Sequence, residues 1–170
     1  MRRKSSRRDF LKTTSGIGLG FWVAGGIAPR ETKAANEQLA FAAVGIGGKG
    51  DSDSRDAANA GRMVAVCDVD RGRLAGATQR FPGAKTYTDF RKMLEEVGDK
   101  IDAVTVSTAD HSHAVAALMA MRMGKHCFCQ KPLTHSIYEA RLMGEVAREK
   151  KVITQMGNQG TASDGLRKAA

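Results

Sequence analysis

The chain has 170 residues, which is enough for one domain and at most a small second one. Its apolar share of 42% is that of an ordinary folded protein and excludes disorder as a global description. The formal net charge is +9, but residues 1–34 supply +6 of it, and the remainder contains no basic patch interleaved with aromatic residues. We therefore expect no nucleic-acid partner.

Residues 1–34 have the layout of an export signal. A basic start is followed by an apolar, glycine-rich run over 13–28 and by the small residue Ala34. Arg7 and Arg8, with Phe10 and Leu11 after them, resemble a twin-arginine (Tat) signal. The apolar run is shorter than the ~20 residues that cross a bilayer. We expect a signal over 1–34, export to the periplasm, cleavage near Ala34 and no stable membrane insertion afterwards. An uncleaved signal that tethers the protein is the alternative.

The first apolar run, 39–46, predicts a strand buried on both faces. Gly45, Gly47 and Gly50 then follow in the order G-x-G-x-x-G. Because the chain has 19 glycines, this pattern alone fits a flexible loop as well as a phosphate-binding turn. A helix is predicted over 52–62, with Asp51, Ser52 or Asp53 as its N-cap.

Strands and helices continue to alternate along the rest of the chain. Further strands are predicted over 63–70, 84–87, 101–108, 125–132 and 152–159, and further helices over 71–82, 89–98, 113–124 and 136–151. In the last helix we expect an apolar face formed by Ile137, Ala140, Leu142, Met143 and Val146. The alternation predicts an α/β fold with a doubly wound, mostly parallel sheet in the order 3-2-1-4-5-6, a Rossmann domain over 35–160. Residues 161–170 are interpreted as the opening helix of a truncated second domain.

The context of the glycines decides between the two interpretations. They lie between a predicted strand and a predicted helix, and Asp68 ends the next strand 18 residues after Gly50. In such a turn Gly45 permits the tight bend, Gly47 lets the backbone approach a diphosphate, and Gly50 lets the helix pack on the strand. The intervening residues Ile46, Gly48 and Lys49 complete the predicted binding turn, which presents backbone N–H groups at a helix N-terminus.

Asp68 is predicted to accept hydrogen bonds from the adenosine ribose, which favours NAD over NADP because a carboxylate repels a 2′-phosphate. Arg71 nearby keeps NADP open as the alternative. Asp70 is either a second ribose contact or a helix cap, and we favour the cap.

Four motifs occur in order: "VGIGGKG" from Val44, "CDVD" from Cys67, "STADHSHA" from Ser107 and "GKHCFCQKPLTHS" from Gly124. Together they resemble the glucose–fructose oxidoreductase / inositol dehydrogenase (Gfo/Idh/MocA) family. The resemblance implies an NAD(P)-binding Rossmann domain followed by an α/β substrate domain. It also implies hydride transfer between a nicotinamide cofactor and a sugar, polyol or related hydroxyl compound.

The resemblance carries over to particular residues near the nicotinamide. It implies that Ser107 and Thr108 lie beside the cofactor and that Asp110 and His113 line its nicotinamide side. Asn158, in "QMGNQG", is implied as a contact at the cofactor edge.

Lys131 matches the lysine of the family's Glu-Lys-Pro motif, which positions cofactor and substrate, and is our candidate catalytic residue. Gln130 stands where the family has glutamate. An amide at this position can form hydrogen bonds but cannot take up a proton.

The family's acid/base histidine belongs to the substrate domain, which is absent from this chain. We therefore interpret the chain as the cofactor half of an oxidoreductase, incomplete for catalysis alone. The alternatives are a non-catalytic dinucleotide-binding module and a truncated product that does not fold stably. The oligomeric state is left open, homo-oligomers included.

The chain contains four histidines and three cysteines, residue types that bind zinc. His111, His113, His126 and His135 do not complete a spaced ligand set, so we expect no metal site. Cys127 and Cys129 share one face of a predicted strand, and with Cys67 they are interpreted as buried thiols rather than as a redox C-x-C motif.

Overall fold

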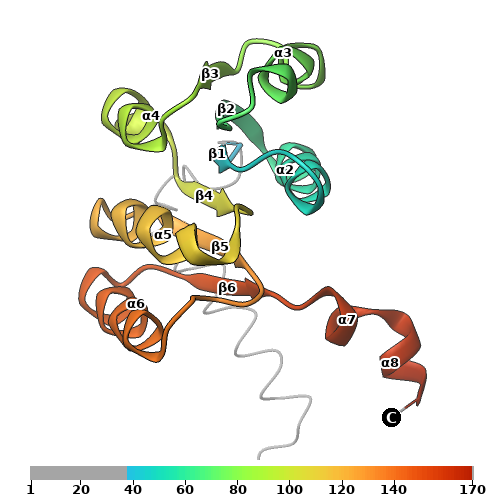
Figure 1. Cartoon of the computed structure of the whole chain (residues 1–170), viewed down its shortest axis with the longest axis vertical. Helices are drawn as coiled ribbons and strands as arrows, with labels where there is room; N and C mark the ends of the chain where they lie inside the picture. Colours follow the sequence, from blue (N-terminus) through green and yellow to red (C-terminus); the bar gives the residue numbers. More distant parts are fainter. Residues whose placement is uncertain (1–37, 170) are drawn as a thin grey trace, which may run out of the picture. The chain divides into compact units, whose positions relative to one another are not determined.

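The structure is a computed structural model that describes residues 38–169. The predicted signal over 1–34 lies outside these residues. Residues 38–169 contain one six-stranded sheet in the order β3-β2-β1-β4-β5-β6, and every strand pair in it is parallel. The doubly wound α/β prediction and its strand order are therefore confirmed (Figure 1).

The observed strands are β1 Ala40–Val44, β2 Arg62–Cys67, β3 Lys85–Tyr87, β4 Ala103–Val106, β5 His126–Gln130 and β6 Thr154–Gly157. Each is shorter than its predicted stretch, because residues at the ends of the stretches, such as Val69 and Ile153, are exposed and lie outside the paired strands. The helices are α2 Lys49–Ala60, α3 Arg71–Arg80, α4 Phe90–Val97, α5 His113–Arg122, α6 Ile137–Lys150, α7 Gln159–Ala162 and α8 Asp164–Ala169. Two 3₁₀ turns, η2 Gly98–Lys100 and η3 Asp110–Ser112, precede β4 and α5. None of the helices in the described range is long and apolar enough to cross a bilayer.

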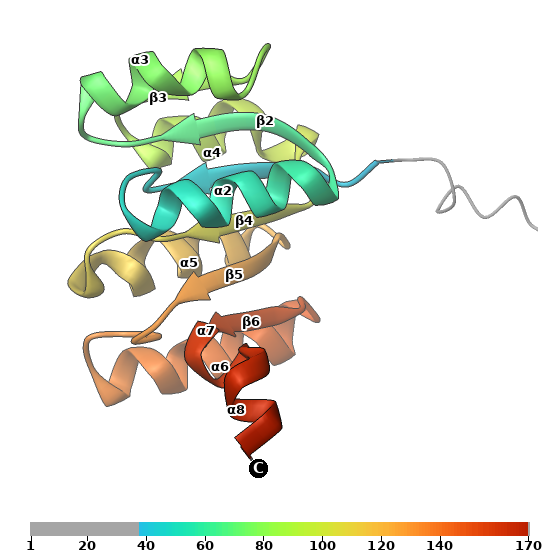
Figure 2. The ribbon, with the colours of Figure 1, turned by 90° about the vertical axis from the view of Figure 1, so that its right-hand side faces the viewer.

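The helices cover the two faces of the sheet, with α2 and α3 on one face and α4, α5 and α6 on the other (Figure 2). Strand β1 shows how the sequence supports both layers. Ala43 packs with Ala57 of α2, whereas the neighbouring Val44 belongs to the opposite core. That alternation is the period of two that a strand buried on both faces requires.

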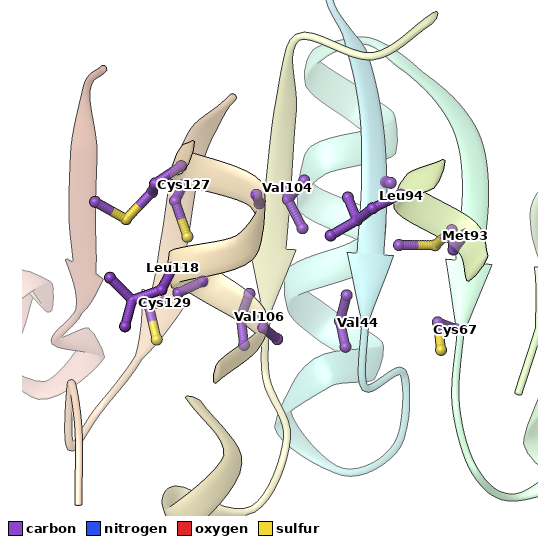
Figure 3. Close-up of a cluster of buried hydrophobic side chains, with 14 of the residues drawn as sticks. Val44, Cys67, Met93, Leu94, Val104, Val106, Leu118, Cys127 and Cys129 are labelled. Atoms are coloured by element: carbon purple, nitrogen blue, oxygen red, sulfur yellow. The ribbon is translucent and has the colours of Figure 1, made fainter. Parts of the chain in front are cut away.

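The larger core lies between the sheet and α4, α5 and α6. Val44, Val104 and Val106 of the central strands meet Leu94 of α4 and Leu118 of α5 (Figure 3). Cys67, Cys127 and Cys129 extend the same apolar cluster along the sheet, as the buried-thiol interpretation expected (Figure 3).

Two details of the helices differ from the predictions. Helix α2 begins at Lys49 with Gly48 as its N-cap and no side-chain capping bond, so Asp51, Ser52 and Asp53 lie inside the helix. The glycine turn replaces the cap, because the N–H of Gly50 donates to the carbonyl of Gly47.

Ile137, expected in the core, is 75% exposed. It is the first residue of α6 and lies within the capping box that Ser136 and Glu139 form, and Met143 and Val146 further along supply the buried face. Asp70, in contrast, caps α3 as favoured, since its side chain accepts from the N–H groups of Gly72 and Arg73.

Candidate functional site

A cleft of about 750 Å³ opens at the carboxyl ends of the central strands. The strand order reverses between β1 and β4, and a sheet of this kind binds ligands at that point. Of the residues predicted from the sequence, the cleft is lined by Gly45, Gly47, Gly48, Lys49, Asp68, Ser107, Thr108, Asp110, His113, Gln130 and Lys131.

The turn between β1 and α2 has the backbone that its glycines predict. Gly45 has φ of 81°, and a Cβ there would lie 2.5 Å from the carbonyl oxygen of Ser107. A Cβ on Gly50 would collide with the carbonyl oxygen of Gly45. Both positions therefore require glycine, since the turn packs directly on the end of β4.

Gly47, Gly48 and Lys49 line the cleft where α2 begins, and their backbone N–H groups precede the first intrahelical hydrogen bonds, whereas the N–H groups of Gly50 and Asp51 donate to the carbonyls of Gly47 and Gly48. The partial positive charge at that end of the helix favours an anion. The side chain of Ile46 points away into the core, where it is 1% exposed.

Asp68 follows β2 directly and is 6% exposed. Its Oδ2 accepts from the N–H of Ile46 at 3.0 Å, and its Oδ1 accepts from the N–H of Asp70 at 3.0 Å. The carboxylate thus faces the cleft beside the glycine turn, where the sequence predicted a ribose contact.

Arg73 is a cleft residue that the sequence analysis missed. Its Nη1 lies 3.6 Å from Oδ2 of Asp68, and its Nε lies 3.6 Å from Oδ2 of Asp70. The guanidinium also covers Gly47, where it occupies the space a Cβ would take. Arg71 was named as the neighbouring cation, but the structure places Arg73 beside Asp68. The sequence does hold a signal for this residue: Arg73 follows the capping Asp70 by three positions, which places the two side chains on the same side of α3.

The segment after β4 forms another wall of the cleft. Ser107, Thr108 and Asp110 all line it, and the hydroxyl of Ser112 donates to Thr108 Oγ1 at 3.0 Å. Asp110 is exposed in the 3₁₀ turn η3 that leads into α5.

The ring of His113 is 1% exposed and lies between two loops. Its Nδ1 is 2.7 Å from the carbonyl oxygen of Pro132, and its Nε2 is 3.0 Å from the carbonyl oxygen of Thr108. A neutral imidazole can donate to one of these oxygens, whereas an imidazolium donates to both. The ring therefore joins the loop after β4 to the loop after β5.

Gln130 is buried at the end of β5, and Lys131 follows it with an exposed side chain at the cleft. The Gln130 amide Nε2 donates to Oδ2 of Asp53 at 2.9 Å. Asp53 is 6% exposed and was considered from the sequence only as a helix cap. It also accepts from the hydroxyl of Ser107 at 2.7 Å and pairs with Lys49 at 2.9 Å.

Asn158 does not line this cleft. It lies in a second, more open depression of about 450 Å³ next to it, together with Lys49, Gln155 and Gly157. Its neighbour Gln159 reaches the first cleft.

The three cysteines are buried and free. Burial, with a smaller contribution from the nearby carboxylates of Asp68 and Asp89, raises the pKa of Cys67 to about 12. Burial likewise raises the pKa of Cys129 to about 12 and the pKa of Cys127 above its usual value. Within residues 38–169 no group of three or more His, Cys, Asp or Glu side chains is placed to hold a metal ion.

Comparison with known proteins places this site in a family. Inositol 2-dehydrogenase of Rubrobacter xylanophilus is 31% identical over 117 residues, which are 67% of this chain and 33% of that protein. Inositol 2-dehydrogenase 2 of Saccharopolyspora erythraea is 39% identical over 77 residues, 45% of this chain and 22% of that protein. The chain thus spans a third or less of the length of these two relatives.

Two solved structures have the same fold as this chain. Myo-inositol 2-dehydrogenase from Lactobacillus plantarum matches with a TM-score of 0.71 and 28% identity over 78% of this chain and 40% of that one. GenD2 from gentamicin A biosynthesis, solved in complex with NAD, matches with a TM-score of 0.71 and 26% identity over 85% of this chain and 41% of that one. The family model of the GFO_IDH_MocA oxidoreductases, described as an NAD-binding Rossmann fold, matches residues 24–158. The chain therefore belongs to the Gfo/Idh/MocA oxidoreductase family and carries its NAD-binding Rossmann domain.

Proposed function

We propose that this chain binds NAD in the cleft and acts as the cofactor half of an oxidoreductase that moves hydride between nicotinamide and a hydroxyl group of a sugar or polyol. One observation carries the proposal: the Asp68 carboxylate is tied to the backbone of the turn that Gly45 and Gly50 make possible. This arrangement offers N–H donors for a diphosphate next to an acceptor for ribose hydroxyls, which is the combination that a dinucleotide needs.

The rest of the cleft suits the nicotinamide half. Besides the turn, the cleft is lined by Thr108, Asp110, His113 and Lys131. A lysine ammonium offers three hydrogen-bond donors and no acceptor, so Lys131 would orient a carboxamide or a substrate hydroxyl. Proton removal from the substrate then requires an acceptor other than this ammonium. A sugar or polyol substrate is supported by the names of the relatives, which include inositol and levoglucosan dehydrogenases.

NADP is the second candidate cofactor, and Arg73 is the observation that favours it. Its guanidinium lies beside Asp68, where the extra phosphate of NADP would be held. We retain NAD as the first candidate because the buried Asp68 carboxylate opposes a 2′-phosphate.

Isothermal titration calorimetry on purified chain, stripped of bound nucleotide, tests the proposal. We expect heat of binding with NAD⁺ and a weaker response to NADP⁺. Enhanced fluorescence of NADH on binding provides a second readout. Absence of binding by either dinucleotide to folded protein overturns the proposal, and binding followed by oxidation of polyols would assign the whole reaction to this chain.

Export is a separate proposal that rests on residues 1–34. Arg7 and Arg8 support a Tat signal, and hence a periplasmic location without stable membrane insertion after cleavage. Replacement of both arginines by lysine should retain the protein in the cytoplasm, as measured by cell fractionation. A protein that reaches the periplasm unchanged in that variant contradicts the proposal.

A further inference from the structure

The buried carboxylate of Asp53 joins elements that the proposed function treats separately. Its Oδ2 accepts from the Ser107 hydroxyl after β4 and from the Gln130 amide at the end of β5. Its Oδ1 pairs with Lys49 in the first turn of α2. Asp53 therefore connects the helix that follows the glycine turn to the ends of both strands on the nicotinamide side of the cleft.

The side chain of Gln130 has one orientation that satisfies both of its ends. Its Nε2 donates to Asp53 at 2.9 Å, and its Oε1 accepts from the backbone N–H of Lys131 at 3.2 Å. A rotation of the amide by half a turn would set Oε1 against the carboxylate and the NH₂ group against the N–H of Lys131. The two contacts therefore form a directed chain of hydrogen bonds from Asp53 to the backbone of Lys131.

Packing keeps Gln130 in this place. It is 5% exposed, and a Cβ added to Gly157 of β6 would lie 2.6 Å from its Nε2. The side chain is held between α2 and the backbone of β6, so the loss of its partner at Asp53 would leave a buried amide group without an acceptor.

We propose that Asp53 is a positioning residue that acts through Gln130 to hold Lys131 at the mouth of the cleft. The inference rests on the proposed function, because that function gives Lys131 its contact with the bound molecules. The chemistry of the pair requires one carboxylate and one amide. Two carboxylates at this distance would repel each other, so that one of them would have to bind a proton.

The first experiment needs no ligand and uses thermal unfolding as a function of pH. In Gln130→Glu the new carboxyl faces Asp53, and repulsion raises the folded-state pKa of the pair above its unfolded value. Stability relative to wild type should then be greatest below about pH 4 and fall as pH rises. The exchanged pair, Asp53→Asn with Gln130→Glu, restores one carboxylate and one amide and should remove this pH dependence. If the exchanged pair behaves like Gln130→Glu alone, the proposal is wrong.

The second experiment measures hydrogen exchange at the Lys131 amide by NMR. Asp53→Ala should raise exchange at Lys131 by about tenfold, because Gln130 loses the contact that fixes its orientation. Asp56→Ala is the matched control, since Asp56 is an exposed residue of the same helix. Gln130→Glu should also raise exchange at Lys131, whereas the exchanged pair should retain the protection of wild type, so this comparison decides the proposal if Asp53→Ala does not fold. Exchange at Lys131 that is as slow in Asp53→Ala and Gln130→Glu as in wild type would overturn it.

The third experiment asks whether Asp53 acts on NAD⁺ binding through Lys131. Asp53→Ala should weaken NAD⁺ about tenfold in the wild-type background and have little effect in a Lys131→Met background. Additive losses would show that Asp53 acts independently of Lys131 and would contradict the proposal. If wild type does not bind NAD⁺, the proposed function fails, while the exchange and pH experiments still decide whether Asp53 positions Lys131.

Discussion

The carboxylate of Asp68 accepts a hydrogen bond at 3.0 Å from the backbone N–H of Ile46, 22 residues earlier in the chain. This bond fixes the end of β2 against the turn after β1, and the same carboxylate also accepts from the N–H of Asp70. One buried side chain therefore shapes the turn and offers an acceptor to the cleft.

Asp68→Asn should weaken NAD⁺ binding by about tenfold or more and lower stability by about 1–3 kcal/mol. An asparagine has one acceptor oxygen, so its NH₂ group would face either the N–H of Ile46 or the N–H of Asp70. Asp70→Asn is the control, because asparagine is as good an N-cap as aspartate and α3 would keep its cap. Calorimetry and thermal unfolding measure the two effects, and an equal response of both variants would contradict the role assigned to Asp68.

Arg73→Gln should change the preference between the two dinucleotides. Loss of the guanidinium removes the charge-assisted contact available to a 2′-phosphate, so NADP⁺ should weaken about tenfold relative to NAD⁺. Arg71→Gln, an exposed residue of the same helix, should leave the ratio unchanged. The measurement is the ratio of the dissociation constants of NADP⁺ and NAD⁺. An unchanged ratio in Arg73→Gln would show that Arg73 does not bind the 2′-phosphate of NADP⁺.

Gly50→Ala should destabilise the fold by about 1–3 kcal/mol, because its Cβ would meet the backbone carbonyl of Gly45 and force the turn away from β4. Dinucleotide affinity should fall with it. Gly76→Ala in α3 is the opposite case, since no atom lies near its added Cβ, and it should stabilise the protein by about 0.5–1 kcal/mol. Chemical denaturation of both variants checks this, and similar stability changes would show that the packing argument fails.

Asp89, the N-cap of α4, should make the stability of the protein depend on pH in the acid range. Hydrogen bonds from the Arg91 side chain and backbone lower the pKa of Asp89 from 3.8 to about 2. A carboxyl group whose pKa is lowered by folding stabilises the protein at pH values above its unfolded-state pKa. That contribution is lost as the pH falls from about 4 toward 2. In Asp89→Asn the difference from wild type should therefore be seen at pH 5 and shrink near pH 2. A difference that is constant across this range would contradict the assignment.

The three thiols should be unreactive in the folded protein. Their burial and raised pKa values leave them protonated and shielded at neutral pH, whereas the nucleophile that attacks a thiol reagent is an exposed thiolate. Ellman's reagent should titrate no cysteine before unfolding and all three in denaturant. Fast reaction of one thiol under native conditions would revive the redox interpretation of the C-x-C motif.

The fold could be predicted because its signals are local. Apolar runs of strand length alternate with helical segments, and short links between them leave little choice of topology. Gly45, Gly50 and Asp68 were also identifiable, since the turn demands glycine at fixed spacing and the acid follows the next strand.

The contacts of Asp53 and Arg73 could not be predicted in the same way. Asp53 and Gln130 are 77 residues apart, and their hydrogen bond depends on how α2 packs against β5. The spacing from Asp70 places Arg73 near that cap, but the contact of its guanidinium with Gly47 depends on how α3 packs beside the glycine turn. Such pairings arise from tertiary packing and leave no periodic pattern in the sequence. Ile137 shows the converse limit, because helical periodicity ignores that a first-turn residue can lie beyond the edge of the core.

The imidazole of His113 holds the carbonyl of Thr108 on one side and that of Pro132 on the other. Because the His113 ring is only 1% exposed, a shift of either loop would move a carbonyl oxygen away from a buried ring nitrogen. The walls that carry Asp110 and Lys131 are consequently preorganised, and the entropy of ordering them is lost on folding rather than on ligand capture.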